Sequence, residues 1–255
     1  DVNNQKAEVI LYRPTGESGD FEKANFPIGV EGGKTSTCPT QNLMEAYDMK
    51  DGTPFVWNNQ SNPYDNRDPR MKYTIVCNEM KWPVDPVEIW EGGTNGLPLQ
   101  NATTTGYYLK KYVNNTISFE AGSTVTKKQH NWVLFRYGEI LLNYAEAMIN
   151  AFHDPNYKDA VYNMSAREAV NQIRGRTNIS LPGFPSDITE KDFVKRLKNE
   201  RRVELAFEGH RFWDVRRWKE LGQTANIYGV KITKNNEVIS YEKFLLETRA
   251  VTDNM

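Results

Sequence analysis

The sequence has few of the residues that build metal centres, disulfide frameworks or membrane spans. Among 255 residues there are two cysteines and three histidines. Cys38 and Cys77 fit no metal-ligand spacing. They are either free thiols or joined in a single disulfide, and both alternatives stay open. No run approaches the roughly 20 consecutive apolar residues of a membrane-spanning helix. We therefore expect no metal, no cofactor and no membrane span in this chain.

The sequence also lacks net charge of either sign. Its 32 basic residues are balanced by 33 acidic ones, which gives a formal charge of −1 at pH 7. Nucleic-acid-binding proteins usually present a net basic face, and proteins that bind anionic membranes carry clusters of Lys and Arg. The composition therefore argues against nucleic acid as a partner and against direct binding to a membrane surface.

The chain changes character near residue 130. Before this point, short ordered segments alternate with long connections rich in Asn, Gly and Pro. We expect a short helix from about 40 to 49 and a strand over 71–79. Long connections without regular structure are uncommon unless they serve a function. Residues 1–129 are therefore the candidate ligand-binding region.

After residue 130 the apolar side chains recur every three or four positions, which is typical of amphipathic helices. We predict helices over 132–152 and 157–174, a third after Thr189 and a fourth over 210–221. Residues 229–240 resemble a β-hairpin around an Asn-Asn turn. The prediction is a single, mainly α domain portion, in which a helical scaffold (130–222) follows the loop-rich part and precedes a hairpin and tail (223–255).

Charges and aromatic residues are concentrated in NERRVELAFEGHRFWDVRRW, residues 199–218. Its basic and acidic residues lie three or four positions apart, so they are neighbours on a helix. The aromatic and aliphatic residues between them have core spacing, and a helix that carries both kinds must bury charge, which is tolerated when the charge is paired. Carboxylates for the arginines are offered by the polar stripe of the preceding helix, Arg136, Glu139, Asn143, Glu146 and Asn150. We interpret this stretch as an ion-paired scaffold and not as a catalytic or nucleic-acid site.

The candidate binding residues are aromatics in the loop-rich part. Each loop tryptophan or tyrosine either anchors its loop to the core or stacks on a ligand ring, and both interpretations stay open. A sugar ring needs a flat apolar surface beside many hydrogen-bond donors and acceptors. The candidates, in order of preference, are Trp82, Trp90, Trp57 and Tyr64, with Asn58 and Asn95 as polar partners.

A carboxylate pair in the same loops raises the alternative of a glycoside hydrolase. Asp65 and Asp68 lie in NPYDNRDPR (62–70), where Asp before Pro is also an ordinary turn residue. Because the turn accounts for these residues, we assign no catalytic residue and expect no enzymatic activity.

Five blocks of this sequence resemble hallmarks of one protein family. ERRVELAFEGHRFWDVRRW strongly resembles the signature of the SusD/RagB family of outer-membrane nutrient-binding lipoproteins. The other blocks follow in the family's order: PTQNLMEAYDMKDG (39–52), NPYDNRDPR (62–70), TTGYYLKKY (104–112) and FRYGEILLNYAEA (135–147). The resemblance extends over about residues 38–250.

The resemblance implies a mostly helical SusD/RagB fold and a non-enzymatic role. Such proteins are attached by an amino-terminal lipid to the outer face of the outer membrane of Gram-negative bacteria. They cover a SusC-like TonB-dependent transporter and capture glycans or other nutrients. The implied partners of this chain are therefore a glycan and a SusC-like transporter, with membrane contact only through a lipid anchor outside this chain.

The sequence departs from the family in extent. Family members are roughly twice as long, and the tetratricopeptide-like half and the lipidated cysteine are missing here. We therefore expect the chain to be a carboxy-terminal portion. No motif transfers an individual binding residue from the family. A protein-interaction scaffold of the transporter complex, without a sugar site of its own, is the first alternative to glycan binding.

Overall fold

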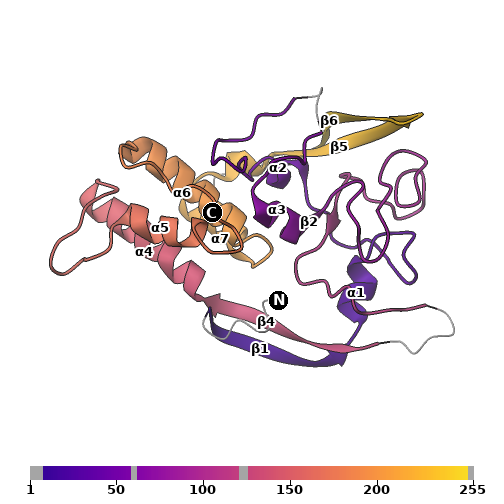
Figure 1. Ribbon diagram of the computed structural model, residues 1–255, viewed down its shortest axis with the longest axis horizontal. Coiled ribbons are helices and arrows are strands. Elements are labelled where there is room, and N and C mark those ends of the chain that lie inside the picture. Colours follow the sequence, from indigo (N-terminus) through magenta and orange to yellow (C-terminus); the bar gives the residue numbers. More distant parts are fainter. Residues whose placement is uncertain (1–7, 59–61, 121–125, 252–255) are drawn as a thin grey trace.

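The computed structural model describes residues 8–58, 62–120 and 126–251. Figure 1 shows the longer helices gathered at one end of the molecule and loop-rich segments with short helices at the other, with long strand pairs along opposite edges. About 29% of the chain is helical and 20% is in strands. The prediction of a mainly α fold is therefore confirmed only in part, because it underestimated the strands.

The helical end contains α4 (Tyr137–Phe152), α5 (Ala166–Arg174), α6 (Glu190–Glu204) and α7 (His210–Arg217). Thr189 caps α6 as predicted, since its side chain accepts a hydrogen bond from the backbone N–H of Asp192. The apolar faces of α4, α5 and α6 enclose one core cluster, made by Leu141, Leu142, Ala145, Met148, Ile149, Ala166, Ala169, Val170, Ile173, Phe184, Phe193, Leu197 and Leu205.

Two of these helices are shorter than predicted. Residues 157–165 do not belong to α5, because the Asp159 carboxylate accepts hydrogen bonds from the backbone of Val161 and Tyr162 and forms a turn. α7 ends at Arg217, and a short 3-10 helix, η2 (Leu221–Thr224), follows it.

A strand pair replaces the first turn of a predicted helix. β1 (Val9–Ser18) runs antiparallel to β4 (Lys128–Arg136), and Trp132 and Val133 pair with Arg13 and Tyr12. The prediction of a helix from residue 132 is wrong for this segment. β-branched and aromatic residues favour strands when a partner strand is available, and here the partner lies over 100 residues away in the sequence.

The loop-rich end holds α1 (Asp20–Asn25), α2 (Gln41–Met44), α3 (Pro69–Thr74), β2 (Ile75–Val76) and β3 (Tyr108–Leu109). The predicted strand over 71–79 is reduced to β2, because Asp68 caps α3 and Pro69 occupies its first position. The helix predicted over 40–49 ends at Met44. A second core cluster fills this end and includes Phe26, Tyr47, Tyr64, Trp82, Tyr107 and Tyr108.

The predicted hairpin is confirmed and is longer than expected. β5 (Asn226–Asn235) pairs with β6 (Val238–Thr248). The turn falls at Asn236 and Glu237, one position later than predicted. Asn236 has φ 54°, in the left-handed region that tight hairpin turns require and that Asn tolerates.

Candidate ligand-binding site

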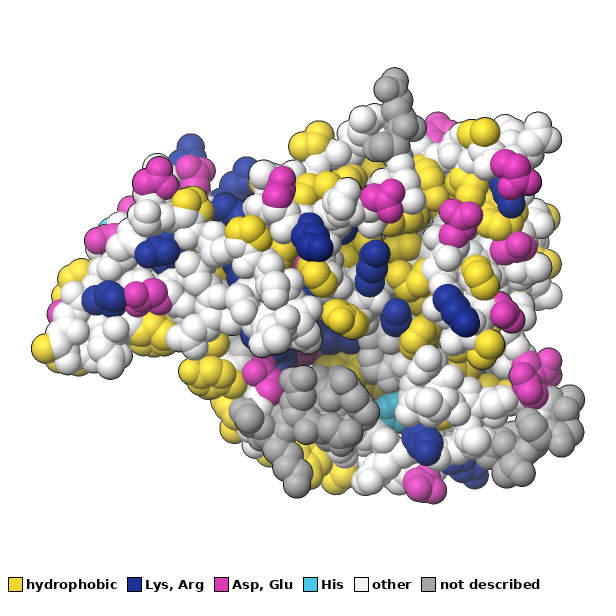
Figure 2. Space-filling view, viewed as in Figure 1, with side chains coloured by type: hydrophobic (Ala, Val, Ile, Leu, Met, Phe, Trp, Pro, Cys, Tyr) yellow, Lys and Arg dark blue, Asp and Glu magenta, His cyan; other side chains and the backbone are white. Residues whose placement is uncertain are grey.

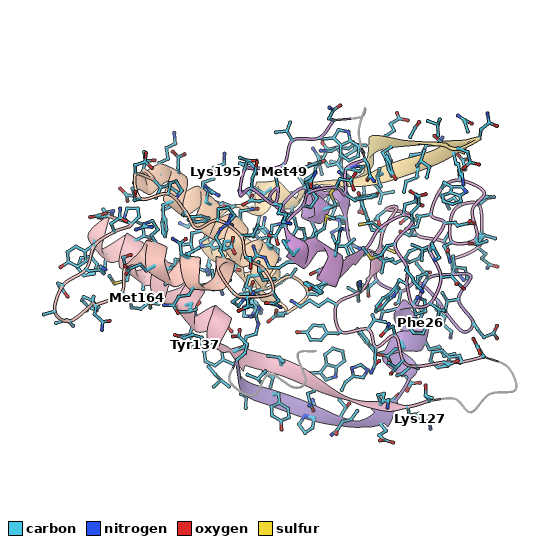
Figure 3. All side chains as sticks on the ribbon, viewed as in Figure 1. Phe26, Met49, Lys127, Tyr137, Met164 and Lys195 are labelled. Atoms are coloured by element: carbon cyan, nitrogen blue, oxygen red, sulfur yellow. The ribbon has the colours of Figure 1, made fainter. Side chains whose placement is uncertain are left out.

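A cavity of about 670 Å³ lies where four loop segments of the loop-rich end meet. This volume is within the range of ligand-binding cavities. Figure 3 labels Phe26 beside α1, in the first of these loops. The cavity is lined by residues 26 and 29–31, 82–87, 94–95 and 115–120.

One amide side chain holds the walls of this cavity together. The Nδ2 of Asn95 donates to the backbone oxygen of Ile28 at 2.6 Å, and its Oδ1 accepts from the backbone N–H of Glu88 at 2.9 Å. Gly29 has φ +88°, and a Cβ added there would lie 2.3 Å from the backbone oxygen of Thr94. A glycine is therefore needed for the first loop to approach the third so closely.

The first predicted binding residue, Trp82, forms part of the wall. Its side chain is 7% exposed and packs into the core cluster, with the Lys110 ammonium 4.9 Å from the ring centroid. Its backbone N–H donates to the carbonyl of Asp85 at 2.8 Å and closes the turn that follows. Its Nε1 has no hydrogen-bond acceptor within the described part of the chain. Trp82 therefore presents little ring surface, and its indole N–H is itself buried.

The polar lining of the cavity consists of acceptors, amides and hydroxyls. Its charged side chains are Glu31, Asp85 and Glu120, and no Lys or Arg side chain is among its described lining residues. Amide and hydroxyl groups come from Asn95, Asn115, Thr94, Thr116 and Ser118. Carboxylates and amide oxygens accept hydrogen bonds from hydroxyl groups, whereas they repel anions. The lining therefore suits an uncharged ligand that carries many hydroxyl groups.

The structure places Asn95 and Trp82 on this cavity and the other four predicted residues elsewhere. Trp90 is half-buried with the Lys234 ammonium 4.3 Å from its ring centroid. Tyr64 is 6% exposed and packs edge-on against Tyr107 and Tyr241.

The remaining two candidates lie together on another loop. Trp57 is half-buried beside Phe55, and Asn58 is exposed. Contact of any of the six candidates with a ligand stays a prediction.

Sequence reasoning missed Phe119, a further aromatic residue of the cavity lining. Phe119 packs edge-on against Phe26, with ring centroids 6.0 Å apart, and both line the cavity. The only signal was an isolated apolar pattern in TISFE (116–120), which is too short to distinguish a binding loop from an ordinary one.

The ion-paired scaffold predicted for residues 199–218 is confirmed by its contacts. Glu204, 5% exposed, accepts from Arg70 at 2.9 Å, Arg136 at 2.8 Å and Arg176 at 2.7 Å. Burial by itself would raise the pKa of Glu204, but the three guanidinium groups, Arg136 foremost, hold that pKa well below its ordinary value. The network joins α6 to α3, to the start of α4 and to the end of α5.

The predicted pairing of the α4 stripe with the arginines of this stretch is confirmed for Glu146. Glu146 binds Arg217, and Asn143 accepts from Arg201, which also binds Asp214 at 2.9 Å. His210 lies 3.6 Å from Glu139.

The prediction that the aromatics of this stretch occupy the core is wrong for α7. Val203 and Leu205 are buried, whereas Phe212 is 53% exposed and Trp213 is 67% exposed. They form an edge-on pair on the outer face of α7. With only eight residues, α7 turns its buried side inward through Asp214 and Val215.

The carboxylate pair considered for hydrolysis is divided between two roles. Asp68 is 1% exposed, caps α3 and binds the Arg70 guanidinium at 2.7 Å. Asp65 is exposed at the surface. The Asp68 carboxylate therefore has a structural role, because Arg70 already binds it.

Both cysteines, Cys38 and Cys77, are free thiols. Within the described residues there is no group of three or more His, Cys, Asp or Glu side chains that could hold a metal ion. In the same residues, no helix combines the length and the apolar character needed to cross a membrane.

The chain is similar to solved structures of SusD-like proteins. One from Bacteroides fragilis matches with a TM-score of 0.76 and 25% identity, over 99% of this chain and 51% of that chain. A second from the same organism, described as a SusD-like carbohydrate-binding protein, matches with a TM-score of 0.71 and 26% identity, over 87% of this chain and 44% of that one. This chain thus spans about half the length of these relatives.

A curated relative, a SusD-like protein of Formosa agariphila, is 37% identical over 91 residues, which is 33% of this chain and 16% of that protein. The sequence model of the SusD family matches residues 8–252. This match covers nearly the whole chain, and the chain belongs to the SusD family.

Proposed function

We propose that the protein binds glycans at the bacterial cell surface and delivers them to a SusC-like TonB-dependent outer-membrane transporter, without itself catalysing a reaction. The observation that carries this proposal is the cavity between residues 26–31, 82–87 and 115–120. Support comes also from family membership and from a relative that is described as carbohydrate-binding.

The cavity lining matches the chemistry of a sugar. Hydroxyl groups of a saccharide donate to the carboxylates of Glu31 and Asp85, and the exposed side-chain amide of Asn115 donates in return to a sugar oxygen. Phe119 provides an apolar surface for the C–H face of a ring. The combination of one apolar wall with several polar groups favours a saccharide over a purely apolar ligand.

The cell-surface location, a lipid anchor and the transporter partner enter the proposal from the family alone. The solved relatives are about twice as long as this chain.

A second candidate function is a protein-interaction scaffold of the transporter complex. The exposed aromatic pair Phe212 and Trp213 favours it, because large exposed aromatics are enriched at protein interfaces. The hydrolase alternative is weakened by the ion pair between Asp68 and Arg70.

A glycan array with the full-length protein tests the proposal, followed by titration calorimetry on the saccharides that bind. Trp82→Ala is a poor probe because removal of a buried Trp destabilises a protein by about 3–5 kcal/mol. Ser118→Trp is better, since Ser118 is half-buried and lines the cavity. We expect the added indole to fill the cavity and to lower affinity at least tenfold.

Ser240→Trp is the matched control, because Ser240 is exposed on β6, outside the cavity lining. It should bind as the unchanged protein does. Normal binding by Ser118→Trp would place the site elsewhere, and absence of any bound glycan would reject glycan binding itself and favour the scaffold.

A further inference from the structure

A second cavity, which we call the α6 groove, lies at the helical end and has the opposite polarity. Its volume is about 460 Å³, and it runs along one face of α6 opposite residues 45–55. Figure 3 shows Lys195 on α6 close to the segment around Met49. The basic residues that line the α6 groove are Lys191, Lys195, Arg196, Lys198, Arg202 and Arg211.

The acidic residues of the α6 groove already have basic partners. Glu200 binds Arg70 and Arg174, and Asp48 binds Arg174 and lies 3.7 Å from Arg196. Glu220 binds Lys198 at 2.6 Å, and Glu45 binds Lys243 at 2.8 Å. The acids in the lining are therefore engaged, three of them wholly or partly by cations from outside the groove.

Four of the cations have no such partner. Arg202 donates to the backbone oxygen of Asn42 at 2.8 Å, and Arg211 donates to the Gln223 amide at 3.1 Å. Among the described residues, neither these two arginines nor Lys191 and Lys195 have a carboxylate oxygen within 4.0 Å. In the scaffold, by contrast, Arg70, Arg136 and Arg201 each bind carboxylates.

This arrangement is electrostatically unfavourable as it stands. Lys191, Lys195, Lys198 and Arg202 follow one another on one helix face at spacings of four, three and four, where like charges repel. Burial and the nearby Arg211 lower the pKa of Arg202 to about 10, and burial also lowers the pKa of Arg211. An anion in the groove would relieve the repulsion and would complete the hydrogen bonding of both guanidinium groups.

We propose that the α6 groove binds the anionic substituents, carboxylate or sulfate ester, of an acidic saccharide. The guanidinium groups of Arg202 and Arg211 both line the groove and can each donate two hydrogen bonds to oxygens of a carboxylate or sulfate ester. Charge-assisted hydrogen bonds of this kind are about twice as strong as neutral ones. Phe55 and Val194, both half-buried in the lining, provide apolar contact for the sugar ring.

The inference rests on the proposed function, from which the saccharide nature of the ligand is taken. It adds that this saccharide is negatively charged. The two cavities suit different groups of a ligand. The lining of the first has no Lys or Arg side chain among the described residues, whereas the lining of the α6 groove contains several. A saccharide with both neutral and acidic units offers a partner to each.

The test is titration calorimetry of the full-length protein with three probes: oligogalacturonates for carboxylate, carrageenan oligosaccharides for sulfate ester, and malto-oligosaccharides as neutral saccharides. We expect at least one anionic probe to bind, and to bind more weakly at 300 mM than at 50 mM NaCl. The double variant Arg202→Gln, Arg211→Gln should lose at least tenfold in affinity for it. Binding of only one anionic probe identifies the substituent, and binding of both supports the shared chemistry.

Arg216→Gln is the control, since it removes one arginine charge from α7 outside the groove lining. It should change affinity less than twofold. If the double variant melts at a lower temperature, Lys195→Gln replaces it, because the Lys195 side chain is exposed.

Three outcomes overturn the inference: unchanged binding by the groove variants, an equal loss in Arg216→Gln, or binding of neutral probes alone. The last would leave the proposed function intact. If no saccharide binds, in calorimetry or on the array, the proposed function is rejected instead. If acidic peptides bind and no saccharide does, the groove is reassigned to a protein partner.

Discussion

The two ends of the molecule satisfy their buried polar groups by different means. At the helical end, buried arginines are neutralised by carboxylates, as in the pairs of Arg136 with Glu204 and Glu208. At the loop-rich end, polar side chains bind backbone groups: Arg67 donates to three carbonyl oxygens, and Asn95 joins two loops. The first arrangement depends on charge and therefore on pH, whereas the second depends on backbone geometry. Figure 2 shows acidic and basic side chains spread over the face that it presents, so surface charge does not distinguish the two ends there.

The largest expected effect removes the centre of the charged network. Glu204→Ala leaves Arg70 and Arg136 buried without one of their carboxylates, and breaking a buried pair costs about 3–5 kcal/mol. Urea unfolding should show this loss. A loss below 1 kcal/mol would mean that the helical end does not depend on charge pairing.

Acid is expected to weaken the same network. The pKa values of Glu200, Glu204 and Glu208 are lowered in the folded protein by their arginine and lysine partners, against burial that raises them. Because the folded pKa lies below the ordinary value of 4.5, their contribution is complete above about pH 4.5 and is lost as the pH falls below it. The free energy of unfolding should fall by up to about 1.4 kcal/mol per pH unit for each such carboxylate. Urea titrations between pH 6 and pH 3 measure this slope, which Glu204→Gln should reduce.

The loop-rich end should respond to backbone changes instead. Gly29→Ala places a Cβ against the Thr94 carbonyl at φ +88°, which we expect to cost about 1–3 kcal/mol and to weaken glycan binding. Gly92→Ala is the control, since Gly92 has φ +89° with open space around its Cβ position. Equal losses in the two variants would show that backbone strain alone, and not the contact between loops, accounts for the effect.

The smallest effect tests the helix cap of α6, where the Thr189 hydroxyl accepts from the backbone N–H of Asp192 and donates to its carboxylate. Thr189→Ala removes the N-cap of α6 and should destabilise the protein by about 1 kcal/mol at any pH between 3 and 6. Thermal melts at both pH values check this. A loss that grows with acid would link the cap to the charged network, contrary to the distinction drawn between charge and geometry.

Local patterns in the sequence were sufficient for some elements. The Thr189 cap and the hairpin of β5 and β6 depend on residues close together in the sequence, and these predictions are confirmed. Residues 199–218 are ion-paired as predicted, with Asp214 and Arg217 as a local pair, but the partners of Glu204 come from distant segments.

Predictions failed where distant segments decide the structure. β4 is extended because β1 pairs with it, and local periodicity in residues 132–136 indicated a helix. The cavity likewise depends on loops brought together by Asn95, so Trp82 and Asn95 were found as separate candidates and Phe119 was missed. The exposure of Trp213 could not be predicted either. Helical spacing shows that residues share a face, but not whether another segment covers that face.

The position of Arg70 has a consequence for how the protein unfolds. It lies on α3 in the loop-rich end, yet its guanidinium binds Glu200 and Glu204 of the helical end, and Lys111 bridges the same two ends through Glu208. Neither core can open without exposing a charge that the other neutralises. We therefore expect both ends to unfold in one cooperative step, so that hydrogen exchange of amides in α3 and α6 reports the same opening free energy.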